Sequence, residues 1–155
     1  MQSSTQKWEV SATSSKLNGV KADQAWSLLA GSYYDLHKYA PSIVVASKKV
    51  SDGIRHVTFT RAGSPTVYWS KERLLKMDQD ERAYTYESVE NTLGLVNMVS
   101  KVRVVPAGTD SCAVEWSLVS EPAPGLARSD LTSLLQAAAS DTAKKVGEFL
   151  RSGAK

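Results

Sequence analysis

The last part of the chain limits its fold most. A long series of β-patterned segments is followed by one extended amphipathic segment, Ala127 to Leu150. The residues that fall on one side of it at helical spacing, all apolar except Thr142, are Leu131, Leu134, Leu135, Ala138, Thr142, Val146, Phe149 and Leu150. A lone helix of this length buries such a side best against a sheet that curves around it. We therefore expect an α+β fold in which an antiparallel sheet wraps around a long C-terminal helix.

Alternation of apolar and polar residues predicts the strands of that sheet. A first strand is expected at 8–15, and two short helices at 22–29 and 34–39, of which Pro41 ends the second. Later strands are expected at about 43–49, 53–60, 66–77, 82–90, 95–105 and 112–120, with a turn at 61–65. A sheet of this kind does not close its core completely on one helix, so an internal hydrophobic cavity is predicted.

The same alternation predicts which side chains face the cavity, because neighbouring residues of a strand point to opposite faces. Three groups are expected on inner faces: Tyr68, Ser70, Glu72 and Leu74; Tyr84, Tyr86, Ser88 and Glu90; and Val96, Met98, Ser100, Val102 and Val104. Cys112, Val114, Trp116 and Leu118 are expected on the inner face of the last strand. As residues that line the site we single out Tyr68, Tyr84, Ser88, Met98, Trp116 and Leu135.

Length and charge limit the classes of function. With 155 residues and 42% hydrophobic content, the chain is long enough for one domain, 1–155. The net charge is +3, but Lys and Arg alternate with Asp and Glu and form no basic stripe. Nucleic acid is therefore not an expected partner. We expect a monomer or a weak dimer.

Cysteine usage and the N-terminus indicate a compartment. Cys112 is the only cysteine, so no internal disulfide can form. Residues 1–7 are polar and lack the apolar core of a signal peptide, and no apolar run approaches the length of a membrane span. We expect a cytoplasmic protein that does not insert into membranes.

Two charged residues lie in the predicted strands on either side of the turn at 61–65. Arg55 is in Gly53-Ile54-Arg55-His56-Val57, and Glu72 is in Trp69-Ser70-Lys71-Glu72-Arg73-Leu74. Burying a charge is costly unless it is paired, so these residues predict a partnered polar site inside a hydrophobic pocket. Such a site can bind a ligand or move a proton. It can also be an ion pair that only fixes the order of the strands.

Motifs of other chemistries are missing from the sequence. It contains no Gly-x-Gly-x-x-Gly, P-loop, His-Glu-x-x-His or Gly-x-Ser-x-Gly pattern. His37 and His56 are separated and lack a clustered third ligand, which makes them poor candidates for a metal site. We therefore expect neither a cofactor nor a metal.

Several segments, in this order, resemble the plant lachrymatory factor synthases of the helix-grip superfamily, which includes START-like domains and the birch-pollen-allergen fold. They are Lys21 to Leu29, Leu36 to Ser42, Gly53 to Val57, Trp69 to Leu74, Tyr84 to Tyr86 and Glu115 to Ser117. The resemblance implies a helix-grip fold and a cofactor-free isomerase or lyase that rearranges an unsaturated sulfenic acid to a thial S-oxide. It further implies that Arg55 polarises the substrate oxygen, that Glu72 shuttles a proton and that Tyr86 orients the polar end of the substrate.

The sequence departs from that family at one position. Met98 stands where the synthases have a second tyrosine, and it offers no hydroxyl. Abscisic acid receptors are also similar, but their His-Arg-Leu latch is matched only by Leu93-Gly94-Leu95. Two hypotheses follow: a small enzyme with Arg55, Glu72 and Tyr86 as catalytic residues, or a carrier or receptor for a small hydrophobic molecule.

Overall fold

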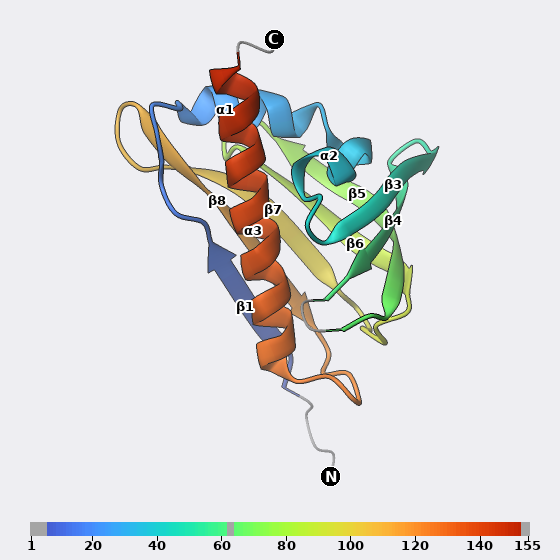
Figure 1. The fold of residues 1–155 in the computed structure, drawn as a ribbon. Coiled ribbons are helices and arrows are strands. Elements are labelled where there is room, and N and C mark those ends of the chain that lie inside the picture. Colours follow the sequence, from blue (N-terminus) through green and yellow to red (C-terminus); the bar gives the residue numbers. More distant parts are fainter. Residues whose placement is uncertain (1–5, 62–63, 153–155) are drawn as a thin grey trace.

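The computed structural model describes residues 6–61 and 64–152, and in this part of the chain an antiparallel sheet wraps around one long helix (Figure 1). The strands are β1 (Trp8–Thr13), β2 (Leu17–Asn18), β3 (Val44–Ser51), β4 (Ile54–Thr60), β5 (Val67–Asp78), β6 (Ala83–Asn91), β7 (Val99–Pro106) and β8 (Ser111–Ser120). The helices are α1 (Ala22–Ala30), the 3-10 turn η1 (Tyr33–Asp35), α2 (Leu36–Tyr39) and α3 (Arg128–Arg151). The predicted helix-grip fold is confirmed. The short strand β2 was not predicted.

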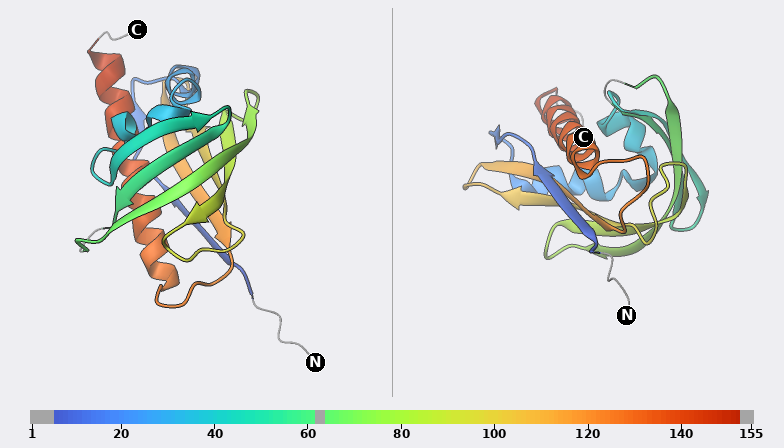
Figure 2. Two further views of the ribbon diagram at one scale, coloured as in Figure 1. Left: turned by 90° about the vertical axis from the view of Figure 1, so that its right-hand side faces the viewer. Right: turned by 90° about the horizontal axis from the view of Figure 1, so that it is seen from below.

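The strands pair in the order β1-β8-β7-β6-β5-β4-β3, and β2 also pairs with β8. Figure 2 shows the sheet curving around α3, with α1 and α2 lying across one end. The edge strand β3 is irregular, because its register with β4 shifts between Val44 and Ala46 and again between Lys49 and Ser51. β4, β5 and β6 are inner strands of the sheet, and they carry Arg55, Glu72 and Tyr86 respectively.

The core lies between α3 and the concave face of the sheet. Leu131, Ala139 and Val146 of α3 are fully buried, as are Val104 of β7 and Val114 of β8. Burying a side chain the size of leucine contributes roughly 2 kcal/mol. The apolar side of α3 that was predicted from helical spacing is therefore the side that packs on the sheet.

A bulge interrupts the pairing of β5 with β6. Lys71 pairs with Glu90 and the next residue, Glu72, pairs with Ser88, so Val89 is an extra residue on β6. Glu90 is consequently exposed, and the prediction that it faces inward is wrong. The inward position beyond Ser88 is occupied by Asn91 instead.

A second correction concerns the start of β7. Asn97 has a left-handed backbone with φ 55°, which breaks the alternation just before the strand begins at Val99. Val96 is 53% exposed, so its predicted inward position is wrong. Met98, by contrast, is buried as predicted.

Two predictions fall on residues outside the described part of the chain. These are most of the polar N-terminal stretch and the middle of the turn at 61–65. No helix in the described residues is long and apolar enough to cross a membrane.

Candidate functional site

A cavity of about 80 Å³ lies between α3 and the sheet. A single water molecule needs only about 10–15 Å³, so there is room for a small ligand. Most of the lining is apolar, and the polar exceptions come from β5, β6, β7 and β8. The lining residues are Leu36, Ile43, Val44, Val57, Phe59, Ser70, Glu72, Tyr86, Ser88, Asn91, Leu93, Leu95, Met98, Ser100, Trp116, Leu118, Leu131, Leu134, Leu135 and Ala138.

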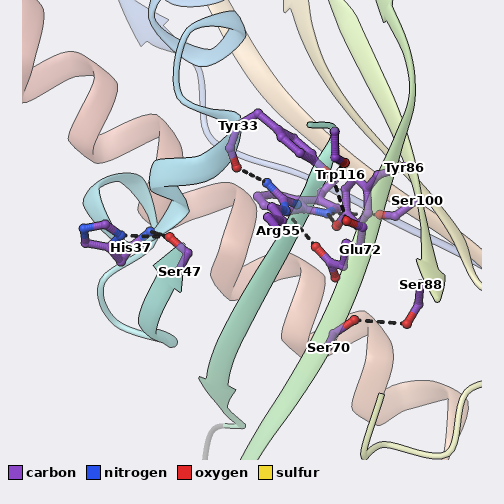
Figure 3. A network of polar contacts seen from close by, with 11 residues as sticks. Tyr33, His37, Ser47, Arg55, Ser70, Glu72, Tyr86, Ser88, Ser100 and Trp116 are labelled. Atoms are coloured by element: carbon purple, nitrogen blue, oxygen red, sulfur yellow. Dashed lines mark hydrogen bonds and ion pairs between the residues drawn. The ribbon is translucent and has the colours of Figure 1, made fainter. Parts of the chain in front are cut away.

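Arg55 and Glu72 form a buried ion pair at the wall of this cavity. They are direct cross-strand partners on β4 and β5. The Arg55 Nε donates to Glu72 Oε1 at 2.8 Å, and the Glu72 side chain is only 9% exposed (Figure 3). Charge-assisted hydrogen bonds of this length are strong when shielded from water. The pair that the sequence predicted is therefore present.

Aromatic rings surround the Arg55 guanidinium. Its central carbon lies 4.2 Å from the Tyr33 ring centroid and 4.6 Å from that of Tyr86, within cation–π range. Arg55 Nη1 also donates to the Tyr33 backbone carbonyl at 2.7 Å. Burial alone lowers the pKa of an arginine, but Tyr84, Glu72 and Tyr86 outweigh it and raise the pKa of Arg55 above its ordinary value. The guanidinium is therefore a permanent charge.

The location of Arg55 differs from what the resemblance implied. Its side chain is completely buried and is not part of the cavity lining. In the described residues, Nη2 has no hydrogen-bond partner. The guanidinium packs against the Tyr33 and Tyr86 rings and not against the cavity. Direct contact between Arg55 and a substrate oxygen does not fit this position. What it contacts directly is Glu72.

Glu72 has a second carboxylate oxygen that Arg55 does not hold. Oε1 is bound by Arg55, and Glu72 is part of the lining. Among the described residues no donor is hydrogen-bonded to Oε2. One oxygen of the carboxylate is thus fixed by a cation and the other is available to a ligand. A carboxylate held in this way can accept and return a proton.

Tyr86 contributes a hydroxyl whose orientation is set by its neighbours. The Trp116 Nε1 donates to the Tyr86 hydroxyl at 3.1 Å and to Ser100 Oγ at 3.2 Å. Ser100 in turn donates to the Ser117 carbonyl at 2.7 Å. Burial raises the pKa of Tyr86, and the Glu72 carboxylate adds to this effect. The phenol is therefore neutral at physiological pH and keeps its own hydrogen for donation.

A further polar group lies along the cavity from Glu72, and sequence analysis found only part of it. Ser70 Oγ and Ser88 Oγ are 3.0 Å apart (Figure 3), and Asn91 Nδ2 donates to Ser88 Oγ at 2.9 Å. Ser88 was predicted to line the cavity, whereas Asn91 was not singled out. Only the bulge at Val89 brings Asn91 to the inner face.

Of the six residues predicted to line the site, Ser88, Met98, Trp116 and Leu135 do so. Tyr84 is buried but lies outside the lining, because its ring packs edge-on against Tyr33 at 5.5 Å. Tyr68 also lies outside it, and stacks on Phe59 at 5.8 Å. Alternation assigns these tyrosines to the correct face but does not say where along the strand the cavity ends.

The histidines lie apart from this site. His37 Nδ1 is 2.8 Å from Ser47 Oγ, and His56 stacks on Trp69 with ring centroids 5.3 Å apart. In residues 6–61 and 64–152, no three His, Cys, Asp or Glu side chains cluster as metal ligands would.

The fold and its cavity agree with a comparison to known proteins. Residues 9–147 match the family described as polyketide cyclase / dehydrase and lipid transport. The chain belongs to this family. Members of the polyketide cyclase / dehydrase and lipid transport family bind hydrophobic ligands, which fits the apolar lining of the cavity.

Solved structures with the same fold include enzymes and proteins of other kinds. The protein XoxI from Bacillus cereus is 23% identical, with a TM-score of 0.70, and the match covers 90% of this chain and 93% of the XoxI chain. A norcoclaurine synthase from Thalictrum flavum, bound to a transition-state analogue, is 23% identical with a TM-score of 0.67 and coverages of 96% and 99%. Major latex-like protein 151 from Panax ginseng is 15% identical, with a TM-score of 0.66 and coverages of 88% and 97%. At these identities the likeness concerns the fold alone.

Proposed function

We propose that the protein is a small, cofactor-independent enzyme of the isomerase or lyase type, acting on a small hydrophobic molecule in the cavity. The observation that carries this proposal is the asymmetric setting of Glu72. Its Oε1 is held by Arg55, its Oε2 has no hydrogen-bond partner among the described residues, and Glu72 lines an apolar cavity. A plain structural ion pair needs no such open oxygen, whereas proton transfer does.

The reaction that we propose is a lachrymatory factor synthase-like rearrangement of an alkenyl sulfenic acid to a thial S-oxide. Glu72 Oε2 takes the proton from the sulfenic O–H group. The electrons of the O–H bond remain on oxygen, which becomes the S-oxide oxygen. A lone pair of sulfur forms the C=S double bond, and the π electrons of the carbon–carbon double bond form the new C–H bond at the far carbon. Glu72 returns the same proton to that carbon, so a C–H bond replaces the O–H bond. No oxidant or reductant is required.

In this mechanism the other two residues have different tasks. Arg55 is a positioning residue, because its cation pairs with Glu72 and fixes Oε1 without lining the cavity. Tyr86 donates its hydroxyl hydrogen to the polar end of the substrate, where negative charge develops on oxygen. We take the protein to act in a reducing compartment such as the cytoplasm, as a monomer or a weak dimer.

Substitution of Glu72 by glutamine tests the proposal. The purified protein is supplied with an alkenyl sulfenic acid generated in place, and the thial S-oxide is measured by mass spectrometry. We expect product from the native protein and a loss of at least 100-fold in rate for Glu72→Gln, which is the usual contribution of a general base. Glu87→Gln is the matched control, because Glu87 pairs with Arg73 away from the cavity and should retain full activity.

A carrier or receptor for a hydrophobic small molecule is the second candidate. It is favoured by Met98, which places a thioether in the lining where the synthases have a tyrosine hydroxyl. The same pair of proteins distinguishes the two functions. If the native protein binds ligand but forms no product, and Glu72→Gln changes the affinity, the enzyme proposal is wrong and the carrier function replaces it.

A further inference from the structure

We propose that Ser70, Ser88 and Asn91 form a second polar subsite. This subsite donates a hydrogen bond to an uncharged oxygen of the ligand, while Glu72 accepts a hydrogen bond from an O–H group of the same molecule. The ligand class is therefore a short, apolar molecule with a hydroxyl-type donor at one end and an ether, carbonyl or sulfoxide oxygen at the other. This rests on the proposed function only in that the same cavity holds the ligand.

The orientation of the Asn91 amide is fixed by the backbone of Leu95. Asn91 Oδ1 accepts the Leu95 N–H at 3.0 Å, and Asn91 Nδ2 donates to the Leu95 carbonyl at 2.9 Å. The second hydrogen of Nδ2 is donated to Ser88 Oγ. Asn91 thus uses both of its amide hydrogens, and it acts on the serines only as a donor.

One hydroxyl hydrogen of the two serines is then left without an acceptor within residues 6–61 and 64–152. A single hydrogen bond joins Ser70 Oγ and Ser88 Oγ, and it consumes one of their two hydrogens whichever serine is the donor. In the described part of the chain, the remaining hydrogen is given no acceptor. Ser70 is only 4% exposed and Ser88 is partly exposed, and both line the cavity, so an acceptor in the cavity can take this hydrogen whichever serine carries it. A hydrogen-bond acceptor inside the cavity is the partner that this arrangement lacks.

The lining restricts the charge of that acceptor. None of the described residues that line the cavity is a lysine, arginine or histidine, and Glu72 carries a negative charge close by. An anionic group on the ligand would be repelled without compensation. An uncharged oxygen is therefore the acceptor that the subsite selects.

The register gives the spacing of the two polar groups. Ser88 is the direct cross-strand partner of Glu72, and such side chains start about 5 Å apart. Ser70 lies two residues from Glu72 on the same strand, which corresponds to about 7 Å. The donor and the acceptor of the ligand are thus separated by a link of about four carbon atoms.

Two probes of nearly equal shape test the subsite. 4-Methoxybutan-1-ol and hexan-1-ol differ only by an ether oxygen in place of a methylene group. Binding of each to the ¹⁵N-labelled protein is measured by NMR titration, for the native protein and for the Ser70→Ala/Ser88→Ala variant. We expect the variant to lose about fivefold in affinity for 4-methoxybutan-1-ol relative to hexan-1-ol, the effect of one hydrogen bond.

Ser120→Ala is the control, because Ser120 is buried on β8 but is not part of the lining. It should leave the affinity ratio unchanged. The single variants Ser70→Ala and Ser88→Ala give the same comparison if the double variant does not fold. An unchanged ratio in the variants, or no binding of either probe, overturns the subsite. Turnover is not measured here, so a failure of the Glu72 chemistry and a failure of the subsite are separate results.

Discussion

At the scale of single residues, Arg55 is a charged side chain with no exposed surface. A cation with no exposed surface is stable only because Glu72, the Tyr33 carbonyl and the neighbouring rings replace water. Removing one member of such a pair leaves the other charge buried without compensation. Replacing both charged residues by apolar ones leaves no unpaired charge, and only the apolar packing must then adjust.

We therefore predict non-additive effects on stability. Arg55→Met should lower the free energy of unfolding by about 3–5 kcal/mol, because Glu72 is left as an unpaired buried charge. The double variant Arg55→Met/Glu72→Leu should recover most of that loss. Urea unfolding of the native protein, both single variants and the double variant measures the coupling. A double variant as unstable as the sum of the single variants would contradict this account.

The sequence was sufficient to predict this pair, but not how completely Arg55 is buried. Two charges in strands joined by a turn predicted that Arg55 and Glu72 meet. Alternation places a side chain on a face of the sheet, and it contains no information about which neighbours cover it. For that reason the position of Arg55 beneath Tyr33 and Tyr86 was visible only in three dimensions.

At the scale of elements, the β5–β6 hairpin is held by its turn as well as by its strands. Asp78 Oδ1 accepts the Glu81 backbone N–H at 3.1 Å, and Asp78 Oδ2 lies 3.1 Å from Lys76 Nζ. The Glu81 N–H and then Lys76 lower the pKa of Asp78. An acid whose pKa is lower in the folded state stabilises the fold at pH values above its ordinary pKa, about 3.9.

This predicts a pH-dependent effect of Asp78→Asn. At pH 7 the variant should melt at a slightly lower temperature than the native protein, because the charge of the turn acceptor is lost. The difference should shrink as the pH falls below 4, where the native Asp78 also becomes protonated. Thermal unfolding followed by circular dichroism at several pH values measures it. Asp80→Asn, at the exposed tip of the same turn, is the control, and an equal, pH-independent loss in both variants would count against the role of Asp78.

Strands and helices were predictable wherever one period continued without interruption. The patterns of β4 and α3 are regular, and each was expected within a few residues of its observed ends. The wrong predictions for Glu90 and Val96 are both caused by a local interruption of the alternation. For Glu90 it is the extra residue Val89, and for Val96 it is the left-handed backbone of Asn97. The bulge has no signature in the sequence, since Val89 fits an ordinary strand, whereas Asn97 is of a type that adopts positive φ more readily than most residues. Asn91, which the bulge brings to the inner face, was missed for the same reason.

At the scale of the whole molecule, part of α3 packs closely on its neighbours and part of it faces the cavity between helix and sheet. Ala138 lines the cavity, whereas the next residue, Ala139, is fully buried and lies outside the lining. The same substitution at the two positions therefore meets empty space in one case and close-packed atoms in the other.

We predict opposite outcomes for leucine at these positions. Ala138→Leu should fill part of the cavity, leave the free energy of unfolding nearly unchanged and weaken binding of small alcohols by at least tenfold. Ala139→Leu should lower the free energy of unfolding by about 1–3 kcal/mol through overpacking. Denaturant unfolding and ligand titration of both variants check this. Equal destabilisation by the two substitutions would mean that the cavity is not open at Ala138.

The irregular edge strand β3 has a consequence beyond this one molecule. The sheet is open, and β3 ends one side of it with exposed Lys48 and Lys49 next to the second shift in register. A strand from another copy would meet a broken row of backbone donors and acceptors and two like charges. Addition of a strand from another copy is therefore disfavoured at this edge of the open sheet.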